Sequence, residues 1–306
     1  MRVLYVSPME YGANPAVDAV GQGLQSRLAE HGIELRVICA DFRSKDWPGT
    51  ADAAMLAGVR TAVDAIVVWV VTPDSAAMGA TAAMRHHIPV ITLERPHYPV
   101  SASLVYPNFN HGVYMAEHLA TLLPPGADVA VIGGPGSVDD DELVLGLQRG
   151  LRLTGLRLVN DPEDPRYKNV TDVAEGGRQK ALNVLADFPR LGGLIPYNDE
   201  TMLGALDALR ETGRLGEVLM VSRNGTPAAV RAVRDGLSTG TWDVDVTGNG
   251  QLLGDLVIRA VVKHEVLDGQ CVAGPIGHMI TPERATRWEP WESRIPYHAF
   301  QSGLDQ

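Results

Sequence analysis

The feature that most restricts the fold of this chain is a regular alternation of short apolar runs with longer amphipathic stretches. The apolar runs predict strands at residues 3–6, 34–39, 65–71, 89–93, 128–132, 156–160, 193–197 and 218–222. The amphipathic stretches predict helices near 15–31, 51–63, 75–86, 111–122, 140–153, 173–188, 200–212, 228–235 and 248–268. Most of the strands are apolar on both faces, which is typical of parallel strands covered by helices on each side. The alternation therefore predicts an α/β protein built on doubly wound parallel sheets.

The chain length favours two such lobes. Its 306 residues exceed one ordinary open-sheet domain and suit two lobes of about 150 residues each. About four strand–helix units precede residue 107, and another four follow residue 125. The last stretch, 275–306, is rich in Pro, Trp and Arg and lacks a helical period, so we expect a return crossing followed by a tail packed on the surface. Ligands of such sheets bind outside the carboxyl ends of the strands.

Charge and composition exclude several classes of protein. The net charge is −11, which leaves no basic face for a nucleic acid. No apolar stretch is long enough to span a bilayer, and no signal peptide precedes the first strand. We therefore expect a cytoplasmic protein, or one whose leader has been removed. Two cysteines, Cys39 and Cys271, exclude a CxxC motif; two unpaired thiols are favoured over one long-range disulfide.

The sequence contains no convincing motif of catalysis or metal binding. The segment from Gly133 to Gly136 follows a strand, but the third glycine of a dinucleotide fingerprint would fall at Asp139, so a tight turn is the better interpretation. The acidic run from Asp139 to Glu142 opens a predicted helix, where carboxylates favour the dipole and cap free amides, and this is favoured over cation binding. His111 and His118 would lie roughly 10 Å apart along a helix, too far to share one metal. We expect no catalytic residue, no cofactor and no metal site.

Four patches in order carry a resemblance. They are Asn14-Pro15 after the first strand, Val-Ile-Thr-Leu-Glu-Arg at 90–95, Asn198-Asp199-Glu200 followed by Leu203-Gly204-Ala205, and Val-Ser-Arg-Asn-Gly-Thr-Pro at 221–227. Together they resemble the type I periplasmic binding proteins, in particular the ribose-binding branch that is related to the effector domains of lac-repressor-type regulators. The resemblance covers the chain from Val3 to about Trp288.

The resemblance implies two lobes joined by three crossings, near 106–111, 244–248 and 274–278. The N-terminal lobe would comprise 1–107 plus 245–276, and the C-terminal lobe 108–244 plus 277–306. A ligand would bind in the cleft between them and favour a hinge-closed state. The implied partners are a small sugar or polyol and the membrane permease of an ABC importer, with the binding protein acting as a monomer.

The resemblance also implies a set of ligand contacts. Sugar sites need planar polar side chains for the hydroxyls and aromatic plates for the ring faces. The family-equivalent polar positions are Asn14, Glu94, Arg95, Asn198 and Asn224. Each has a simpler alternative: Asn14 and Asn198 as helix N-caps, Glu94 with Arg95 as a surface pair, and Asn224 with Gly225 as a turn.

Three further ligand residues are predicted from the residues themselves. Tyr11 and Trp69 are candidate aromatic plates, although core packing explains Trp69 equally well. Alternation along residues 241–245 puts Asp243 and Asp245 on one face of a strand, and Asp243 is preferred as a hydroxyl acceptor.

Departures from the family pattern widen the choice of ligand. The paired aromatics of the family are Ala16-Val17 here, its second-lobe arginine is Leu143, and its glutamine at the second crossing aligns with Val244. A ribose assignment does not follow, and another sugar, a polyol or a non-sugar remains open. We expect a solute-binding protein of an ABC importer that acts in the periplasm, or outside the cell on a lipid anchor. The alternative is a cytoplasmic effector domain that lacks its DNA-binding module, and an enzyme on the same fold is a third possibility.

Overall fold

The computed structural model describes residues 1–303, which divide into two units that we describe separately. Unit 1 consists of Met1–Tyr106, Val246–Pro275 and the described C-terminal segment from Trp291. Unit 2 consists of Pro107–Asp245 and Ile276–Pro290. Each unit is built on its own mainly parallel sheet, which confirms the predicted α/β class with two doubly wound lobes.

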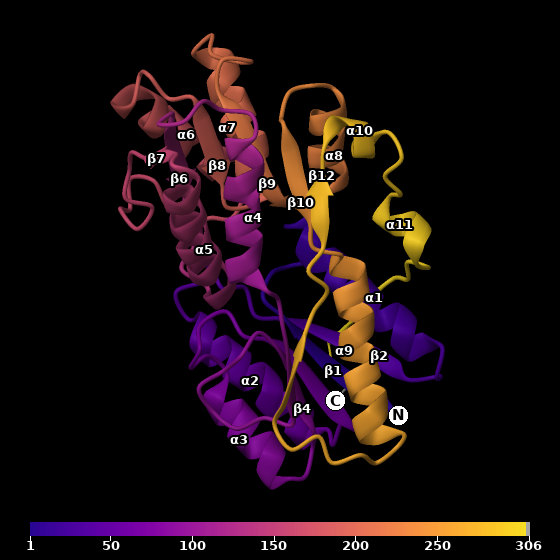
Figure 1. Ribbon diagram of the computed structural model, residues 1–306. Helices are drawn as coiled ribbons and strands as arrows, with labels where there is room; N and C mark the ends of the chain where they lie inside the picture. Colours follow the sequence, from indigo (N-terminus) through magenta and orange to yellow (C-terminus); the bar gives the residue numbers. More distant parts are fainter. Residues whose placement is uncertain (304–306) are drawn as a thin grey trace. The chain divides into compact units, whose positions relative to one another are not determined.

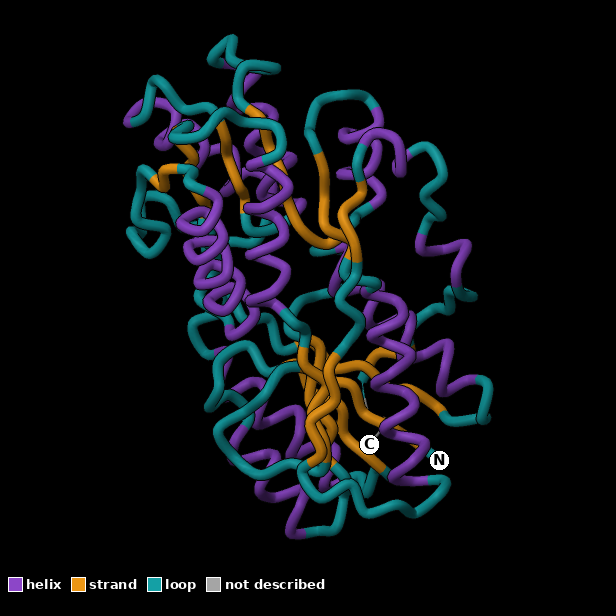
Figure 2. The backbone as a smooth tube through the Cα atoms, in the orientation of Figure 1, coloured by secondary structure: helices purple, strands orange, loops and turns teal. Residues whose placement is uncertain are grey.

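Unit 1 contains a seven-stranded parallel sheet in the order β11-β5-β4-β3-β1-β2-β13. Its strands are β1 (Arg2–Ser7), β2 (Glu34–Cys39), β3 (Ala65–Trp69), β4 (Val90–Leu93), β5 (Ala102–Val105), β11 (Gln270–Ala273) and β13 (Gln301–Ser302). Its helices are α1 (Pro15–Ala29), α2 (Trp47–Arg60), α3 (Ala77–Arg85), α9 (Val246–Val261) and the single turn α11 (Trp291–Arg294). Figure 2 shows these strands gathered into one sheet with helices along it.

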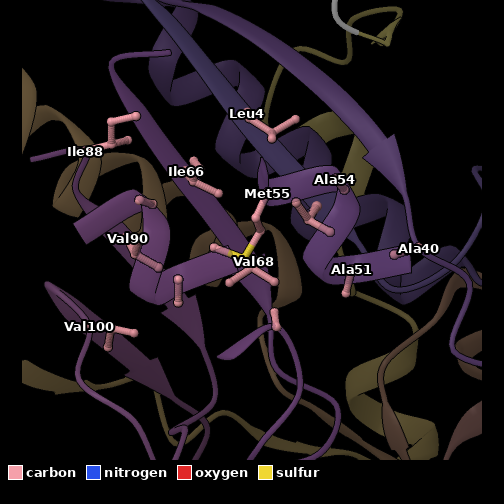
Figure 3. Packing of buried hydrophobic residues seen from close by; sticks show 14 of the residues in the cluster. Leu4, Ala40, Ala51, Ala54, Met55, Ile66, Val68, Ile88, Val90 and Val100 are labelled. Atoms are coloured by element: carbon pink, nitrogen blue, oxygen red, sulfur yellow. The ribbon is translucent and has the colours of Figure 1, made fainter. Parts of the chain in front are cut away.

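One face of this sheet is covered by α2 and α3. Successive residues of a strand point to opposite faces, so Leu4 and Val6 of β1 join the same apolar cluster as Met55 of α2. Figure 3 shows the Met55 side chain lying against Val68 of β3. Met55, Leu4 and Val68 are at most 1% exposed, so this cluster fixes α2 on the sheet by apolar burial.

The other face carries α1 and α9, which lie side by side (Figure 1). The two helices approach so closely that only glycine fits at the contact. A Cβ atom on Gly23 would lie 2.1 Å from the Thr247 carbonyl oxygen, and one on Gly250 would lie 2.1 Å from the Val20 carbonyl oxygen. The first helix of the chain is therefore interlocked with a helix from its last quarter.

Unit 2 contains a six-stranded sheet in the order β12-β10-β9-β8-β6-β7, parallel except for β12, which runs antiparallel to β10. The strands are β6 (Asp128–Ile132), β7 (Arg157–Leu158), β8 (Gly193–Pro196), β9 (Leu219–Asn224), β10 (Gly240–Asp243) and β12 (His278–Ile280). The helices are α4 (Asn108–Ala120), α5 (Val138–Thr154), α6 (Ala174–Asp187), α7 (Asp199–Glu211), α8 (Pro227–Arg234) and the single turn α10 (Pro282–Ala285).

Two helix pairs of unit 2 also pack through glycines. Helices α4 and α5 run side by side (Figure 1), and a Cβ atom on Gly146 would lie 2.0 Å from the Phe109 carbonyl oxygen. In the α6–α7 pair, a Cβ atom on Gly204 would lie 1.8 Å from the Ala174 carbonyl oxygen. The small residues fix how each pair packs beside the sheet.

Some elements differ from the prediction. Helix α9 ends at Val261 rather than 268, because the chain turns at His264, whose φ of 53° lies in the left-handed region. The strands β5, β11, β12 and β13 have two to four residues each, too few for a periodic pattern, and they were missed. The predicted turn after β6 is found, since Gly133 to Gly136 join β6 to α5.

The C-terminal segment differs from the expectation of a surface tail in the second lobe. The chain passes between units after Tyr106, Asp245 and Pro275, and once more after Pro290. Strand β13 pairs with β2 of unit 1, and Trp291 is only 1% exposed. The segment therefore belongs to unit 1 and packs into it.

Both cysteines are free thiols. Cys39 lies in β2 and Cys271 in β11, and four strands separate β2 from β11 in the sheet order. This arrangement separates the two sulfur atoms too far for a disulfide.

Candidate ligand-binding site

Three predicted site residues meet at the carboxyl edge of the unit 2 sheet. Asn198 follows β8, Asn224 ends β9, and Asp243 ends β10, and these three strands are adjacent. Asn224 is the register partner of Asp243. All three are buried, with 3%, 8% and 1% of their surface exposed. The structure thus places these three polar groups at one edge of the sheet, and their role in ligand binding stays a prediction.

Asn198 has a structural role as well. Its Oδ1 accepts a hydrogen bond from the Thr201 amide at 3.0 Å, so it is the N-cap of α7. Its Nδ2 donates to Asp172 Oδ1 at 2.5 Å, and the Tyr197 hydroxyl donates to the same oxygen. Asn198 is therefore a helix cap, as the alternative interpretation proposed. A ligand that contacts Asn198 would bind a side chain that also caps α7.

Asp243 is held in place by its own neighbours. It accepts hydrogen bonds from the Asp245 amide at 2.8 Å and from the Trp288 indole at 3.2 Å. The expectation that Asp243 and Asp245 share a strand face is wrong, because β10 ends at Asp243 and Asp245 adopts a φ of 49°. Asn224 also has a positive φ, 125°, and is followed by Gly225 at 73°, so the turn alternative describes its backbone.

A buried arginine that the sequence did not single out lies beside this edge. Arg223 is 5% exposed and precedes Asn224 on β9. It donates from Nη1 to Asn108 Oδ1 at 2.8 Å and from Nη2 to Asp139 Oδ2 at 3.0 Å. The one available signal was that Arg223 stands where the resembling family has phenylalanine.

The acidic run at the start of α5 lies in the first turn of the helix and also forms an ion pair with β9. Asp139 forms the ion pair with Arg223, and the N-cap residue Ser137 makes no side-chain capping bond. Burial, and then the charge of Asp139, raise the pKa of Asp140 well above its ordinary value. The Ser137 hydroxyl lies 2.6 Å from Asp139 Oδ1 and 2.7 Å from Asp140 Oδ2, yet it has only one proton. A protonated Asp140 donating to Ser137, with Ser137 donating to Asp139, satisfies all three groups.

Asp199 ties the three site strands together. Its carboxylate accepts hydrogen bonds from the Ser222 hydroxyl, from the Thr241 hydroxyl at 2.7 Å and from the Thr226 amide at 2.7 Å. Burial nevertheless raises the pKa of Asp199 to about 6, against the effect of these donors. Burial, followed by the charge of Asp199, raises the pKa of the neighbouring Glu200 to about 7. The edge is therefore rigid and rich in carboxyl groups.

In unit 1, the polar candidates follow β1 and β4. Asn14 is 2% exposed, and its Oδ1 accepts from the Ala16 amide at 2.9 Å, which makes it the N-cap of α1. Glu94 is 1% exposed, has a φ of 68°, and accepts from the Tyr106 amide at 3.4 Å. The positive φ directly after β4 turns the Glu94 side chain inward, where it contacts the start of the segment that leaves unit 1.

Arg95, unlike the buried Glu94, has an exposed side chain. It is exposed and lines a groove of about 810 Å³ between the 95–101 loop and the 265–269 segment of unit 1. The structure therefore does not pair Glu94 with Arg95 on a common surface. The ligand-binding role of Arg95 stays a prediction.

The two aromatic candidates, Tyr11 and Trp69, differ in how much of the side chain is exposed. Tyr11 is 64% exposed, and its ring meets that of Phe300 edge to face with centroids 5.0 Å apart. Trp69 is half-buried at the carboxyl end of β3, beside Leu93 of β4. The residues at the family's changed positions, Leu143 and Val244, are buried and apolar.

Two α/β units, each with buried polar side chains at the carboxyl edge of a parallel sheet, define a bilobal ligand-binding protein of the doubly wound class. A family model described as "Periplasmic binding protein domain" matches residues 5–265. The chain belongs to this family, as the resemblance predicted.

Named relatives are binding proteins. The chain is 25% identical over 267 residues to the ribose import binding protein RbsB of Bacillus subtilis, covering 85% of this chain and 80% of that protein. It is 26% identical over 194 residues to a xylitol-binding protein of Mycolicibacterium smegmatis, covering 60% and 52%.

Solved structures share the fold. A solute-binding protein of an ABC transporter from Actinobacillus succinogenes, solved with D-allose, superposes with a TM-score of 0.82 at 19% identity, covering 94% of this chain and 99% of that one. The myo-inositol-binding protein of Caulobacter also superposes with a TM-score of 0.82 at 19% identity, covering 94% and 95%. Within residues 1–303, no helix is both long and apolar enough to cross a membrane.

Proposed function

We propose that this protein is the solute-binding component of an ABC importer and that it binds a small sugar or polyol without chemical turnover. Membership of the periplasmic binding protein family supports the class. The relatives named for ribose and xylitol support a polyhydroxy ligand. The name of the ribose import binding protein favours transport over the effector-domain alternative. The proposed site of action is outside the cytoplasmic membrane, with the protein delivering its ligand as a monomer to a permease.

The observation that carries the proposal is the polar edge made by Asn198, Asn224 and Asp243. An amide side chain donates and accepts hydrogen bonds, and a carboxylate has about four acceptor sites on its two oxygens, which matches the alternating donors and acceptors of adjacent hydroxyl groups. We propose that Asn14, Glu94 and Arg95 of unit 1 complete the set, so that the ligand joins both units and favours closure by contacting each. Tyr11 and Trp69 remain the proposed apolar contacts for C–H faces of the ligand.

The proposal leaves the particular sugar open for a physical reason. Ala16, Val17, Leu143 and Val244 offer no hydrogen bonds where the ribose-binding pattern has aromatic or polar groups. A ligand matched to this chain would therefore make fewer polar contacts at those positions. Micromolar affinity, the order expected of such a site, corresponds to about −8 kcal/mol.

A thermal-shift screen followed by calorimetry tests this proposal. The panel contains pentoses, hexoses, pentitols and inositols. A ligand that binds only the folded state raises Tm, and the stabilisation grows with the logarithm of its concentration once that exceeds Kd. Arg95→Ala should weaken binding of the hit at least tenfold with little loss of stability, because Arg95 is exposed. Asp243→Asn should also weaken binding at least tenfold, at some cost in stability, because its amide nitrogen cannot accept one of the two hydrogen bonds that the Asp243 oxygens now accept. The exposed Asp235→Asn and Arg60→Ala variants are matched controls and should bind as the wild type does.

Two results would contradict the proposal. One is a hit whose affinity is the same in Asp243→Asn, Arg95→Ala and the controls, which would place its site elsewhere. The other is conversion of the bound hit to a new compound during prolonged incubation, detected by NMR of the recovered ligand, which would show an enzyme.

A further inference from the structure

A small pocket in unit 1 shares Tyr11 with the proposed sugar contacts and is otherwise lined by different residues. It has a volume of about 160 Å³ and lies between α1 and the β1–β2 part of the sheet. Strand alternation explains its chemistry: Leu4 and Val6 face the α2 side, so Tyr5 and Ser7 face α1. The pocket is also lined by Asp18, Cys39, Tyr11 and Phe300.

The floor of the pocket contains a buried hydroxyl group without a partner. Tyr5 is 2% exposed, and within residues 1–303 its hydroxyl has no hydrogen-bond partner. Ser7 is the nearby polar group, but its own proton is donated to the Met9 carbonyl oxygen at 2.8 Å. A buried polar group normally finds a partner because desolvation without one costs free energy. Tyr5 lines the pocket, so a guest that reaches its hydroxyl would supply the missing partner.

The wall formed by α1 contains a carboxylate without a counter-ion. Asp18 is half-buried, and burial raises its pKa to about 6. Its one hydrogen bond in the described chain comes from the Gly12 amide at 2.9 Å, and no Lys, Arg or His of that part of the chain forms an ion pair with it. The lining residues include a second carboxylate, Glu10, and no basic side chain. The pocket is thus negative and lacks the cation that such a site favours.

The outer wall is aromatic and is held in place by the C-terminal segment. The rings of Tyr11 and Phe300 meet edge to face with an interplanar angle of 84°. Gln22 of α1 donates to the His298 carbonyl and accepts from the His298 amide, both at 2.8 Å, which fixes the chain two residues before Phe300. Gly21 leaves room for that ring, since a Cβ atom there would lie 2.8 Å from it.

From these features we infer a second ligand site, which takes a small organic monocation with a primary ammonium group and a short apolar body. The ammonium group would pair with Asp18 and donate to the Tyr5 hydroxyl oxygen, while the aromatic rings attract the positive charge and cover the alkyl body. The volume equals about five waters, which suits a molecule of roughly five to seven non-hydrogen atoms and is too small for a hexose.

The chemistry of the pocket separates this ligand from the alternatives. A metal ion would require a cluster of ligating side chains, and within residues 1–303 no group of three or more His, Cys, Asp or Glu side chains could hold one. A neutral alcohol of the same size would fill the volume but leave the Asp18 charge without a partner. The preference for charge is therefore the property to measure.

The experiment uses the full chain, with butylammonium chloride as the probe and 1-butanol as its neutral counterpart. Calorimetry and saturation-transfer NMR should show butylammonium binding at least tenfold more tightly than butanol. Asp18→Asn keeps an acceptor for Gly12 and should lose at least tenfold in butylammonium affinity. Asp46→Asn removes one exposed carboxylate at the start of α2, forms the matched control, and should bind as the wild type does.

A second variant and a second measurement test the same inference independently of Asp18→Asn. Cys39→Leu narrows the pocket while leaving Asp18 intact, and it should also lose binding, so it decides the matter if Asp18→Asn fails to fold. Carbon-detected NMR should show the pKa of Asp18 falling when butylammonium is bound. Equal affinity for butanol, unchanged binding in Asp18→Asn, an Asp18 pKa that does not move, or no binding of butylammonium would each overturn the inference. None of these outcomes bears on the sugar site, because its test uses different residues and ligands.

Discussion

The contact between α1 and α9 makes a quantitative prediction for Gly250→Ala. The new Cβ atom would lie 2.1 Å from the Val20 carbonyl oxygen and 2.8 Å from the Leu24 amide nitrogen, distances that real Cβ atoms essentially never show. The helices must therefore move apart, and overpacking of this kind costs about 1–3 kcal/mol or more. Alanine gains back up to about 1 kcal/mol over glycine in a helix interior. We expect the free energy of unfolding to fall by about 2 kcal/mol.

The matched control is Gly49→Ala in α2. A Cβ atom there would have no neighbour within 4 Å, and Gly49 does not adopt a positive φ. Only the helix propensity changes, so this variant should gain about 0.5–1 kcal/mol. Urea unfolding followed by circular dichroism gives both values from the midpoint at an unchanged m value. A Gly250→Ala protein as stable as Gly49→Ala would refute the reasoning from close helix contact.

Four further predictions concern unit 2 and the C-terminal segment. Arg223→Met should lower the free energy of unfolding by about 3–5 kcal/mol in urea titrations, because it leaves the Asp139 carboxylate without its buried cation. Asn198→Ala should cost about 1–2 kcal/mol in the same assay through loss of the α7 cap, in addition to weakened ligand binding. The pKa of Glu200 is raised from 4.5 to about 7 in the folded state, so its contribution to stability is complete below pH 4.5 and is lost as the pH rises through 7. Glu200→Gln should remove about 1–2 kcal/mol of the change in the free energy of unfolding between pH 5 and 8, measured by urea titration at each pH, and an unchanged slope would contradict the assignment. Trp291→Ala should cost about 3–5 kcal/mol, and a much smaller loss would show that the C-terminal segment is only loosely attached to unit 1.

The main strands could be predicted because buried strands consist of apolar residues. Val3 to Val6 and Val129 to Ile132 are apolar on both faces, as strands covered on both sides require. Strand β5 was missed because its four residues, Ala102–Val105, follow β4 through a loop rather than through a helix. Strand β12 has only three residues and runs antiparallel, so the alternation of strands and helices did not indicate it.

For the candidate site, the sequence could predict which strand each residue follows. Asn198 and Asn224 lie together because parallel neighbours end at one edge, and that inference needs only the strand boundaries. The pairing of Arg223 with Asp139 could not be predicted, since it joins residues that are far apart in the sequence and needs the distance between β9 and α5. The buried Tyr5 hydroxyl could not be predicted either. Whether it has a hydrogen-bond partner depends on how other helices and the C-terminal segment pack around it.

The interlocking of α1 with α9, together with the pairing of β13 with β2, bears on how the protein is synthesised. Helix α1 packs against α9, and β2 pairs with β13, both of which follow the whole first segment of unit 2 along the chain, so unit 1 stays incomplete until those later elements have been made. Most of unit 2 is one continuous stretch and would acquire its structure sooner, which reverses the usual order in which the amino-terminal domain folds first. The nascent amino-terminal strands, with their apolar faces uncovered, are therefore the part of this protein with the greatest need of a chaperone.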